Sequence, residues 1–217
     1  MKRFVLMSSI RAQVGVTHPD IVTEETPAAP TDAYGRSKLE AEKVMAAALE
    51  GSSTRWTVLR PVLVYGPGVK GNMAALMRIA GLPVPLPFGA LKARRSLVSI
   101  DNLISAVQYV LQTQTAENTA FIVADRDALT MADIIRALRR GMGRSQLLLP
   151  VPDSSLAGLL RLAGKADLAD RVMGDLVVDA ARLRRIGWAP PETAADALAA
   201  SATAMRPAVR GQEAATL

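Results

Sequence analysis

A tyrosine and a lysine are the side chains of this sequence whose types and spacing best suit catalysis. Tyr34 and Lys38 fall in a segment with helical periodicity, which places them one turn apart on one helix face. An ammonium group beside a phenol favours the phenolate, so the tyrosine could act as a general acid or base. A hydroxyl at a nearby strand end, Ser9 or Ser8, would orient the substrate oxygen. The pair alone is a weak signal, because this spacing also occurs by chance on many helices.

Composition excludes several other chemistries. The 217 residues contain no cysteine, which excludes a cysteine nucleophile, a thiolate zinc site and a disulfide scaffold. His18 is the single histidine, so a Ser-His-Asp triad would have to use it and no two-histidine metal site can form. The net charge of +6 suits an anionic ligand, a nucleic acid or a basic surface. Aromatic residues make up only 4% and no long basic block is present, so we expect no nucleic-acid partner.

The sequence also gives no sign of a membrane segment. No apolar run approaches the ~18–20 residues that a spanning helix needs. The basic start is followed by only a short apolar stretch at 4–7, whereas a signal peptide has a core of ~7–15 apolar residues. We therefore expect a cytoplasmic chain with no membrane partner.

Alternating apolar strands and helical segments predict an α/β fold. Asp101 is expected to cap the third helix, and Thr130 with Asp133 resembles a capping box for the fourth. Residues 11–32 contain three prolines and no clear period, which indicates a long surface loop. The predicted strands are 4–7, 56–60, 96–100 and 119–123, and the predicted helices are 34–49, 72–80, 102–112, 130–140, 154–163, 167–173, 179–186 and 193–205.

The order of these features resembles a known family over nearly the whole chain, from Phe4 to about Ala200. It is similar to the extended short-chain dehydrogenase/reductases of the NAD-dependent epimerase/dehydratase type, near the UDP-glucose/UDP-galactose 4-epimerases. The motifs that carry the resemblance are a strand ending in Ser8-Ser9, a loop, Tyr34 with Lys38, a strand ending in Leu59-Arg60-Pro61, and the turn Tyr65-Gly66-Pro67-Gly68.

The resemblance implies the C-terminal part of a Rossmann-like parallel sheet with a small, mostly helical substrate-binding lobe. Residues 1–66 and about 96–125 would be the remainder of the NAD-binding domain. Residues 67–95 and 126–206 would form the nucleotide-sugar lobe, and 207–217 a flexible tail.

The resemblance also assigns roles around the cofactor. Tyr34 matches the tyrosine that shuttles the proton of the sugar hydroxyl, and Lys38 matches the lysine that binds the nicotinamide ribose. Ser9 is the best match to the catalytic serine or threonine, and Ser8 stays an alternative next to the cofactor. Backbone contacts to the nicotinamide would come from Pro61 and Val62.

On the substrate side, the resemblance assigns four residues. Asn72 matches a contact to the nucleotide diphosphate, and the segment from Leu86 to Phe88 matches the strand that lies along the uracil. Arg95 matches the arginine that pairs with the diphosphate, which suits a guanidinium fork. The ordinary alternatives are a helix N-cap for Asn72 and a solvated strand-end charge for Arg95.

Two features depart from the family pattern. No Gly-x-Gly-x-x-Gly follows the first strand, and Pro67 deprives the turn at 66–68 of an N–H that could hold phosphate. The family's N-terminal part, with its glycine-rich loop, is therefore expected to be missing from residues 1–217. Such a sheet would expose an open edge, which favours poor solubility or partner-dependent folding. The second departure is Leu63, where the family often has asparagine.

These observations predict an NAD-dependent nucleotide-sugar 4-epimerase-like enzyme, with NADP as a possible substitute and a UDP-linked sugar as substrate. A reductase of a 4-keto nucleotide sugar would share every residue named above. A non-catalytic sugar-nucleotide-binding relative is the alternative from another class. A 4,6-dehydratase is not expected, because Ile10 and Arg11 stand where dehydratases carry an Asp-Glu pair. A homodimer stays open as the oligomeric state.

Overall fold

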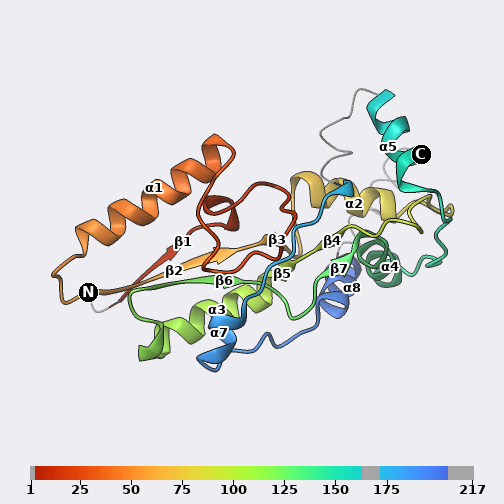
Figure 1. The fold of residues 1–217 in the computed structure, drawn as a ribbon. Helices are drawn as coiled ribbons and strands as arrows, with labels where there is room; N and C mark the ends of the chain where they lie inside the picture. Colours follow the sequence, from red (N-terminus) through yellow and green to blue (C-terminus); the bar gives the residue numbers. More distant parts are fainter. Residues whose placement is uncertain (1–2, 163–171, 205–217) are drawn as a thin grey trace, which may run out of the picture. The chain divides into compact units, whose positions relative to one another are not determined.

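A computed structural model describes residues 3–162 and 172–204, which belong to two compact units (Figure 1). The sheet unit, as we name it, comprises Met1–Val64, Ser96–Ala128 and Asp175–Pro191. The helical unit comprises Tyr65–Arg95, Leu129–Gly174 and Glu192–Leu217. The expected division put all of 126–206 in the second group, whereas residues 175–191 belong to the sheet unit. The expected functional roles of the two parts stay predictions.

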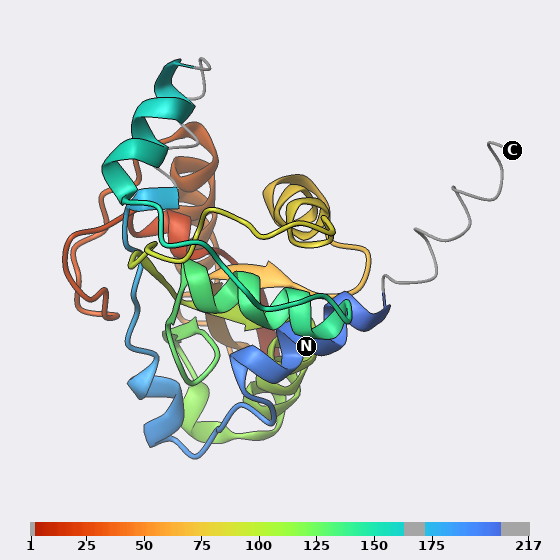
Figure 2. The same ribbon diagram turned by 90° about the vertical axis from the view of Figure 1, so that its right-hand side faces the viewer.

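The sheet unit is built on three parallel strands in the order β1-β2-β6. The strands are β1 (Arg3–Met7), β2 (Arg55–Pro61) and β6 (Thr119–Val123). Figure 1, and the turned view in Figure 2, show α1 (Ala33–Ala48) and α3 (Ile100–Gln112) on opposite sides of this sheet. The centre of β2, from Thr57 to Leu59, is buried because both faces of the sheet are covered. The core includes Leu59, Val98, Val110, Phe121, Ile122 and Trp188.

Residues 175–186 join the sheet unit through backbone hydrogen bonds to segments far away in sequence. The Ser96 N–H donates to the Leu176 carbonyl at 2.8 Å, and the Val22 N–H donates to the Val177 carbonyl at 2.9 Å. The short helix α7 (Ala181–Arg185) follows this stretch. Helical periodicity could not show that residues 175–186 belong to the sheet unit, because their position depends on backbone hydrogen bonds to residues far away in the sequence.

The connections of the sheet unit are short elements. A two-stranded sheet pairs β3 (Leu63–Tyr65) with β5 (Leu97–Ser99). Two single turns of 3-10 helix, η1 (Ile10–Ala12) and η2 (Gln114–Ala116), lie after β1 and after α3. The long loop expected at 11–32 is present apart from the turn η1, which directly follows Ser8 and Ser9.

The helical unit contains four described helices of at least ten residues and a small antiparallel pair of strands. A glycine allows two helices of this unit to approach closely, because a Cβ at Gly141 would lie 2.0 Å from the Ala199 carbonyl oxygen. The strands β4 (Arg94–Arg95) and β7 (Leu129–Thr130) pair antiparallel. The helices are α2 (Gly71–Ala80), α4 (Met131–Gly141), α5 (Asp153–Leu162) and α8 (Ala194–Ala204).

Two predicted helix caps have different outcomes. Thr130 caps α4, because its hydroxyl oxygen accepts the Asp133 N–H at 3.1 Å. The Asp101 cap is wrong: Ser99 accepts the Asn102 N–H at 3.0 Å, and Asp101 lies within the first turn. Both residues are good caps, and the end of β5 decides between them. The helix predicted at 167–173 lies mostly outside the described residues, and the tail at 207–217 lies wholly outside them.

Candidate active site at the carboxyl end of the sheet

The predicted tyrosine-lysine pair lies on α1 beside the end of β1. The Lys38 ammonium donates to the Met7 carbonyl oxygen at 3.1 Å and lies 5.8 Å from the centre of the Tyr34 ring. The Tyr34 side chain is 53% exposed, so its phenol is accessible to a ligand. The lysine therefore connects the helix to the strand end from which Ser8 and Ser9 continue.

A close approach fixes the first turn of α1 against η1. A Cβ on Gly35 would lie 2.2 Å from the Arg11 carbonyl oxygen, so only glycine fits there. Asp32 caps the helix by accepting the Gly35 N–H at 2.7 Å and forms an ion pair with Arg11 at 2.6 Å. The Gly35 N–H and the Arg11 guanidinium hold the pKa of Asp32 below its ordinary value. The helix start that carries Tyr34 is thereby tied to the turn that follows Ser9.

The two candidate serines are both buried and have different partners. The Ser8 hydroxyl donates to the Glu42 carboxylate. The Ser9 hydroxyl oxygen accepts the Arg11 N–H at 3.2 Å and caps η1. An ionised carboxylate can only accept, so the Ser8 proton is engaged, whereas the bond at Ser9 uses only its oxygen.

Sequence reasoning missed a largely buried ion pair between Arg60 and Glu42, the carboxylate that accepts from Ser8. Arg60 donates to Glu42 through Nε at 3.0 Å and Nη2 at 2.5 Å, and its Nη1 donates to Gln13 at 3.1 Å. One available signal was the spacing of Tyr34, Lys38 and Glu42, which continues one helix face at four-residue steps.

The predicted cofactor contacts at the end of β2 lie at the same carboxyl end of the sheet as Ser8 and Ser9. Met7 pairs with Leu59, so Ser8-Ser9 and Pro61-Val62 leave neighbouring strands at neighbouring points. Pro61 and Val62 are buried, and the Val62 N–H donates to the Val123 carbonyl at 3.1 Å. Leu63 is 50% exposed. The carboxyl ends of parallel strands are the usual ligand-binding edge of such sheets.

The predicted substrate residues belong to the helical unit. Leu86 is buried and forms a parallel bridge with Leu148, and its carbonyl accepts the Leu149 N–H at 2.8 Å. Phe88 is half-buried in the same loop, and Arg95 is half-buried in β4. Asn72 lies in α2, and its side chain is outside the described part of the chain. The structure thus brings Leu86 and Phe88 together, and the roles of all four stay predictions.

The glycines in and after the turn at 66–68 have the spacing of a phosphate-binding loop, although Pro67 removes one N–H from that turn. Gly66, Gly68 and Gly71 match Gly-x-Gly-x-x-Gly, and Gly68 and Gly71 have positive φ angles of 77° and 65°. They follow β3, which pairs with β5, and Gly71 is the first residue of α2. They therefore do not follow a strand of the three-stranded parallel sheet, as the dinucleotide fingerprint would.

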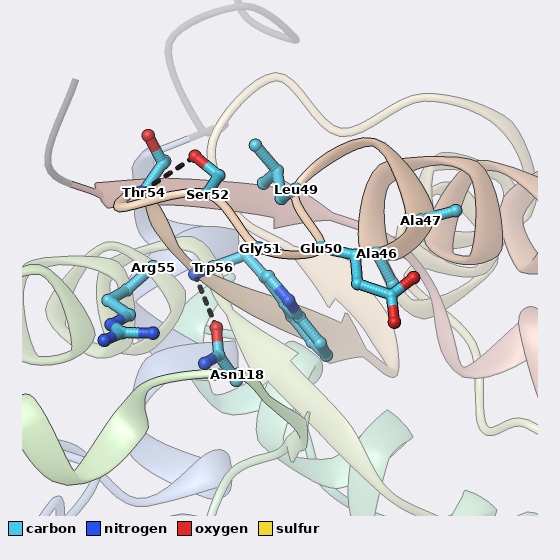
Figure 3. Close-up of a pocket in the computed structure, with 10 residues that line it drawn as sticks. All are labelled: Ala46, Ala47, Leu49, Glu50, Gly51, Ser52, Thr54, Arg55, Trp56 and Asn118. Atoms are coloured by element: carbon cyan, nitrogen blue, oxygen red, sulfur yellow. Dashed lines mark hydrogen bonds between the residues drawn. The ribbon is translucent and has the colours of Figure 1, made fainter.

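The described cavity lies away from these residues. A hollow of about 800 Å³ opens at the amino end of the sheet, between the end of α1 and the starts of β2 and β6 (Figure 3). Trp56 and Asn118 form part of its wall, and they are joined by the Trp56 N–H, which donates to the Asn118 side chain at 3.2 Å. No predicted site residue lines this hollow.

The described residues also limit the metal and membrane hypotheses. Over 3–162 and 172–204, no group of three or more His, Asp or Glu side chains is arranged to hold a metal ion. Within those same ranges no helix combines the length and apolar character that crossing a membrane requires.

Comparison with known proteins identifies the family. Residues 1–124 match the model of the NAD-dependent epimerase/dehydratase family. The chain belongs to this family of enzymes. The resemblance inferred from the sequence is therefore confirmed.

Two curated relatives support the family and define how much of it is present. A UDP-glucose 4-epimerase from Vibrio cholerae is 39% identical over 196 residues, which cover 89% of this chain and 60% of that protein. An N-acetyl-α-D-glucosaminyl-diphospho-ditrans,octacis-undecaprenol 4-epimerase from Escherichia coli O157:H7 is 25% identical over 215 residues, covering 91% of this chain and 63% of that protein. The chain thus spans less than two thirds of the length of either relative.

Solved structures confirm the α/β fold with its parallel sheet. The UDP-glucose 4-epimerase of Thermotoga maritima with UDP-glucose has a TM-score of 0.70 at 18% identity, covering 96% of this chain and 64% of that one. The Thermus thermophilus UDP-glucose 4-epimerase with NAD has a TM-score of 0.67 at 20% identity, covering 95% of this chain and 65% of that one.

Proposed function

We propose that this chain is the part of an NAD-dependent nucleotide-sugar 4-epimerase that carries the acid-base residues and the nucleotide-sugar site. The observation that carries the proposal is the position of Lys38, whose ammonium is bonded to the Met7 carbonyl and lies 5.8 Å from the Tyr34 ring. The family membership and the names of the relatives support a UDP-linked sugar as substrate. The sheet unit would hold the nicotinamide end of the cofactor, and the helical unit the nucleotide sugar.

In this mechanism NAD, when bound, supplies the hydride chemistry at C4 of the sugar. The Tyr34 oxygen takes the proton of the C4 hydroxyl and returns it after the keto sugar has presented its other face. The Lys38 ammonium, 5.8 Å from the centre of the Tyr34 ring, binds the nicotinamide ribose. The Ser9 hydroxyl donates a hydrogen bond to the C4 oxygen and keeps its proton. We prefer Ser9 to Ser8 for this step because the Ser8 proton is engaged by Glu42.

The described residues fit one end of the dinucleotide. Tyr34 and Lys38 suit the nicotinamide ribose, and Pro61 and Val62 offer backbone beside it. Among the described residues, no strand of the parallel sheet leads through a glycine turn into a helix, the element that normally holds the pyrophosphate. We therefore expect residues 1–217 alone to bind NAD more weakly than ~1 mM and to show no turnover. Isothermal titration of the purified chain tests this, and micromolar affinity would overturn it.

The substrate half of the proposal is testable without the cofactor. Arg95→Ala should weaken UDP-glucose binding by ~1.5–3 kcal/mol, the scale of a charge-assisted hydrogen bond. Arg136→Ala is the control, because Arg136 is another arginine of the helical unit and forms an ion pair with Asp133 on the surface. Titration with UDP-glucose should separate the two variants. Equal losses in both would assign Arg95 a structural role.

The reaction itself is tested by joining the chain to the N-terminal part of the Vibrio cholerae relative. Interconversion of UDP-glucose and UDP-galactose with no net consumption of cofactor supports the epimerase. Net oxidation of NADPH with a 4-keto nucleotide sugar would support the reductase instead. Sugar-nucleotide binding with neither reaction would indicate a non-catalytic relative.

A further inference from the structure

Four polar side chains, Ser8, Gln13, Glu42 and Arg60, form a largely buried network at the carboxyl end of the sheet. The exposed fractions are 3% for Ser8, 0% for Gln13 and 8% for Glu42, and 12% of the Arg60 side chain is exposed. They come from the end of β1, the loop after η1, the middle of α1 and the end of β2. All four belong to the sheet unit, so one network joins every element that carries a predicted catalytic residue.

The bonds run in one continuous chain. Glu42 accepts the Ser8 hydroxyl and, at 3.0 and 2.5 Å, two N–H groups of Arg60. Arg60 donates a third N–H to the Gln13 side-chain oxygen at 3.1 Å. The Gln13 amide nitrogen donates to the carbonyls of Thr23 and Thr26, both at 2.6 Å. The long loop after η1 is thereby fixed to the same carboxylate as Ser8.

Such a network is an expensive way to stabilise a fold. A buried ion pair loses much of its Coulombic gain to desolvation, and a well-packed apolar pair is often equally stable. What the ion pair adds is a fixed side-chain orientation, because a carboxylate between a guanidinium fork and a hydroxyl permits few orientations. The orientation of Glu42 affects the site because Glu42 lies one helical turn after Lys38 and two after Tyr34, on the same face.

We propose that Glu42 is a positioning residue for the acid-base site, acting with Arg60. Through Ser8 it fixes the strand end that presents Ser9, and through α1 it fixes the rotation of the helix that presents Lys38 and Tyr34. This inference rests on the proposed function for its catalytic consequence. Its structural consequence, a rigid end of β1, stands without it.

The alternative is that the pair only stabilises the fold, and a double variant separates the two roles. Removing either partner alone leaves an unpaired buried charge, so Glu42→Gln should lower the Tm by roughly 10 °C. Replacing both charges in Glu42→Met/Arg60→Met should recover most of that loss. The matched control is Arg3→Met, which removes the ion pair of Arg3 with Glu117 (3.1 Å) at the start of β1, the opposite end of the strand.

The first measurement is hydrogen exchange of the whole chain, followed in peptides that cover 8–14 and 33–42. In the double variant we expect exchange in both peptides to be about 10-fold faster, although global stability has recovered. In Arg3→Met, exchange of these peptides should change only as far as its lower global stability requires. Unchanged exchange in the double variant would overturn the proposal. If the double variant does not recover its Tm, Glu42→Gln is compared with Arg3→Met at temperatures of equal global stability.

The second measurement is turnover in the fusion protein used to test the proposed function. We expect kcat of the double variant to fall about 10²-fold with little change in KM, since small misplacements of catalytic groups have effects of this size. Recovery of kcat together with Tm would overturn the positioning role. If the unaltered fusion shows no turnover, the proposed function fails, and the exchange result still decides the role of Glu42.

Discussion

At one edge of the parallel sheet, β6 has polar side chains where another strand would bind. The Ile122 N–H donates to the Glu24 carboxylate at 3.1 Å, and the Ala120 carbonyl accepts from Arg182 at 3.3 Å. Arg182 also forms an ion pair with Glu25 at 2.6 Å. An acceptor and a donor therefore replace two of the partners that a neighbouring strand would supply, and these charged side chains oppose strand addition at this edge.

The strand at the other lateral edge of the sheet is β1, and its outer side has a different kind of contact. In the described part of the chain, no strand pairs with β1 on the side away from β2. The Ser8 N–H faces β2, because it donates to the Leu59 carbonyl at 2.8 Å, so the Met7 backbone faces outward by alternation. The side chain that reaches it is Lys38, which our proposal also assigns to the cofactor. At the β6 edge the charged side chains only bind the strand backbone. At the β1 edge the charged side chain that binds the backbone, Lys38, also belongs to the candidate site.

The largest expected effect tests whether function belongs only to the β1 edge. In the fusion protein with the Vibrio cholerae N-terminal part, Tyr34→Phe should lower kcat by ~10²–10⁴, the range for losing a general acid or base. Arg182→Met at the β6 edge should leave kcat nearly unchanged. Steady-state rates with UDP-galactose measure both. A Tyr34→Phe enzyme that keeps more than about a third of its activity would remove Tyr34 from the mechanism.

A second prediction concerns the stability that Glu24 and Arg182 give to the β6 edge. Glu24→Ala/Arg182→Met should lower the free energy of unfolding by about 2–3 kcal/mol, because two backbone groups of β6 lose charged partners. Urea denaturation of the chain measures the change. Glu25→Ala is the control: its ion pair with Arg182 is exposed to solvent and should contribute much less to stability. Equal effects of the two changes would show that the stabilisation by Glu24 and Arg182 does not come from the β6 backbone.

A third prediction concerns association through the β1 edge. The chain should self-associate with increasing concentration, because unpaired strand edges template pairing. Met7→Pro should weaken this association, since proline removes an outward N–H without breaking a bond to β2. Sedimentation velocity over a concentration series measures the effect. Association that survives Met7→Pro undiminished would place the contact elsewhere.

The smallest expected effect is a pH dependence at the β6 edge. Burial raises the pKa of Glu24 above its ordinary value of 4.5, and the Ile122 N–H opposes the shift. The folded state therefore holds the proton more tightly than the unfolded state, and stability falls as pH rises through this raised pKa. Glu24→Gln keeps an acceptor and cannot ionise, so it should gain stability relative to the unaltered chain as the pH rises from the ordinary pKa of 4.5 through the raised pKa. Urea midpoints across this range measure the difference, and a relative loss in Glu24→Gln would contradict the assignment.

The sequence predicted what depends on local pattern. The strands that became β1, β2 and β6 and the helix that became α1 follow from apolar runs and periodicity. The pairing of Glu42 with Arg60 could not be predicted in the same way, because an acidic residue on a helix is usually solvated. Its burial depends on β2 passing below α1, which only the folded chain shows. The contact of Glu24 with β6 likewise joins residues 98 positions apart, for which no local signal exists.

Gly35 has a consequence for anyone who would engineer this protein for heat resistance. Replacing a glycine inside a helix with alanine is a standard stabilising change, because it removes backbone freedom from the unfolded chain and gains about 0.5–1 kcal/mol. At Gly35 the added methyl would lie 2.2 Å from a backbone oxygen, so the helix would have to move away from η1. A design guided by helix propensity alone would therefore choose Gly35→Ala in the first turn of α1. That substitution would move Tyr34 away from Ser9.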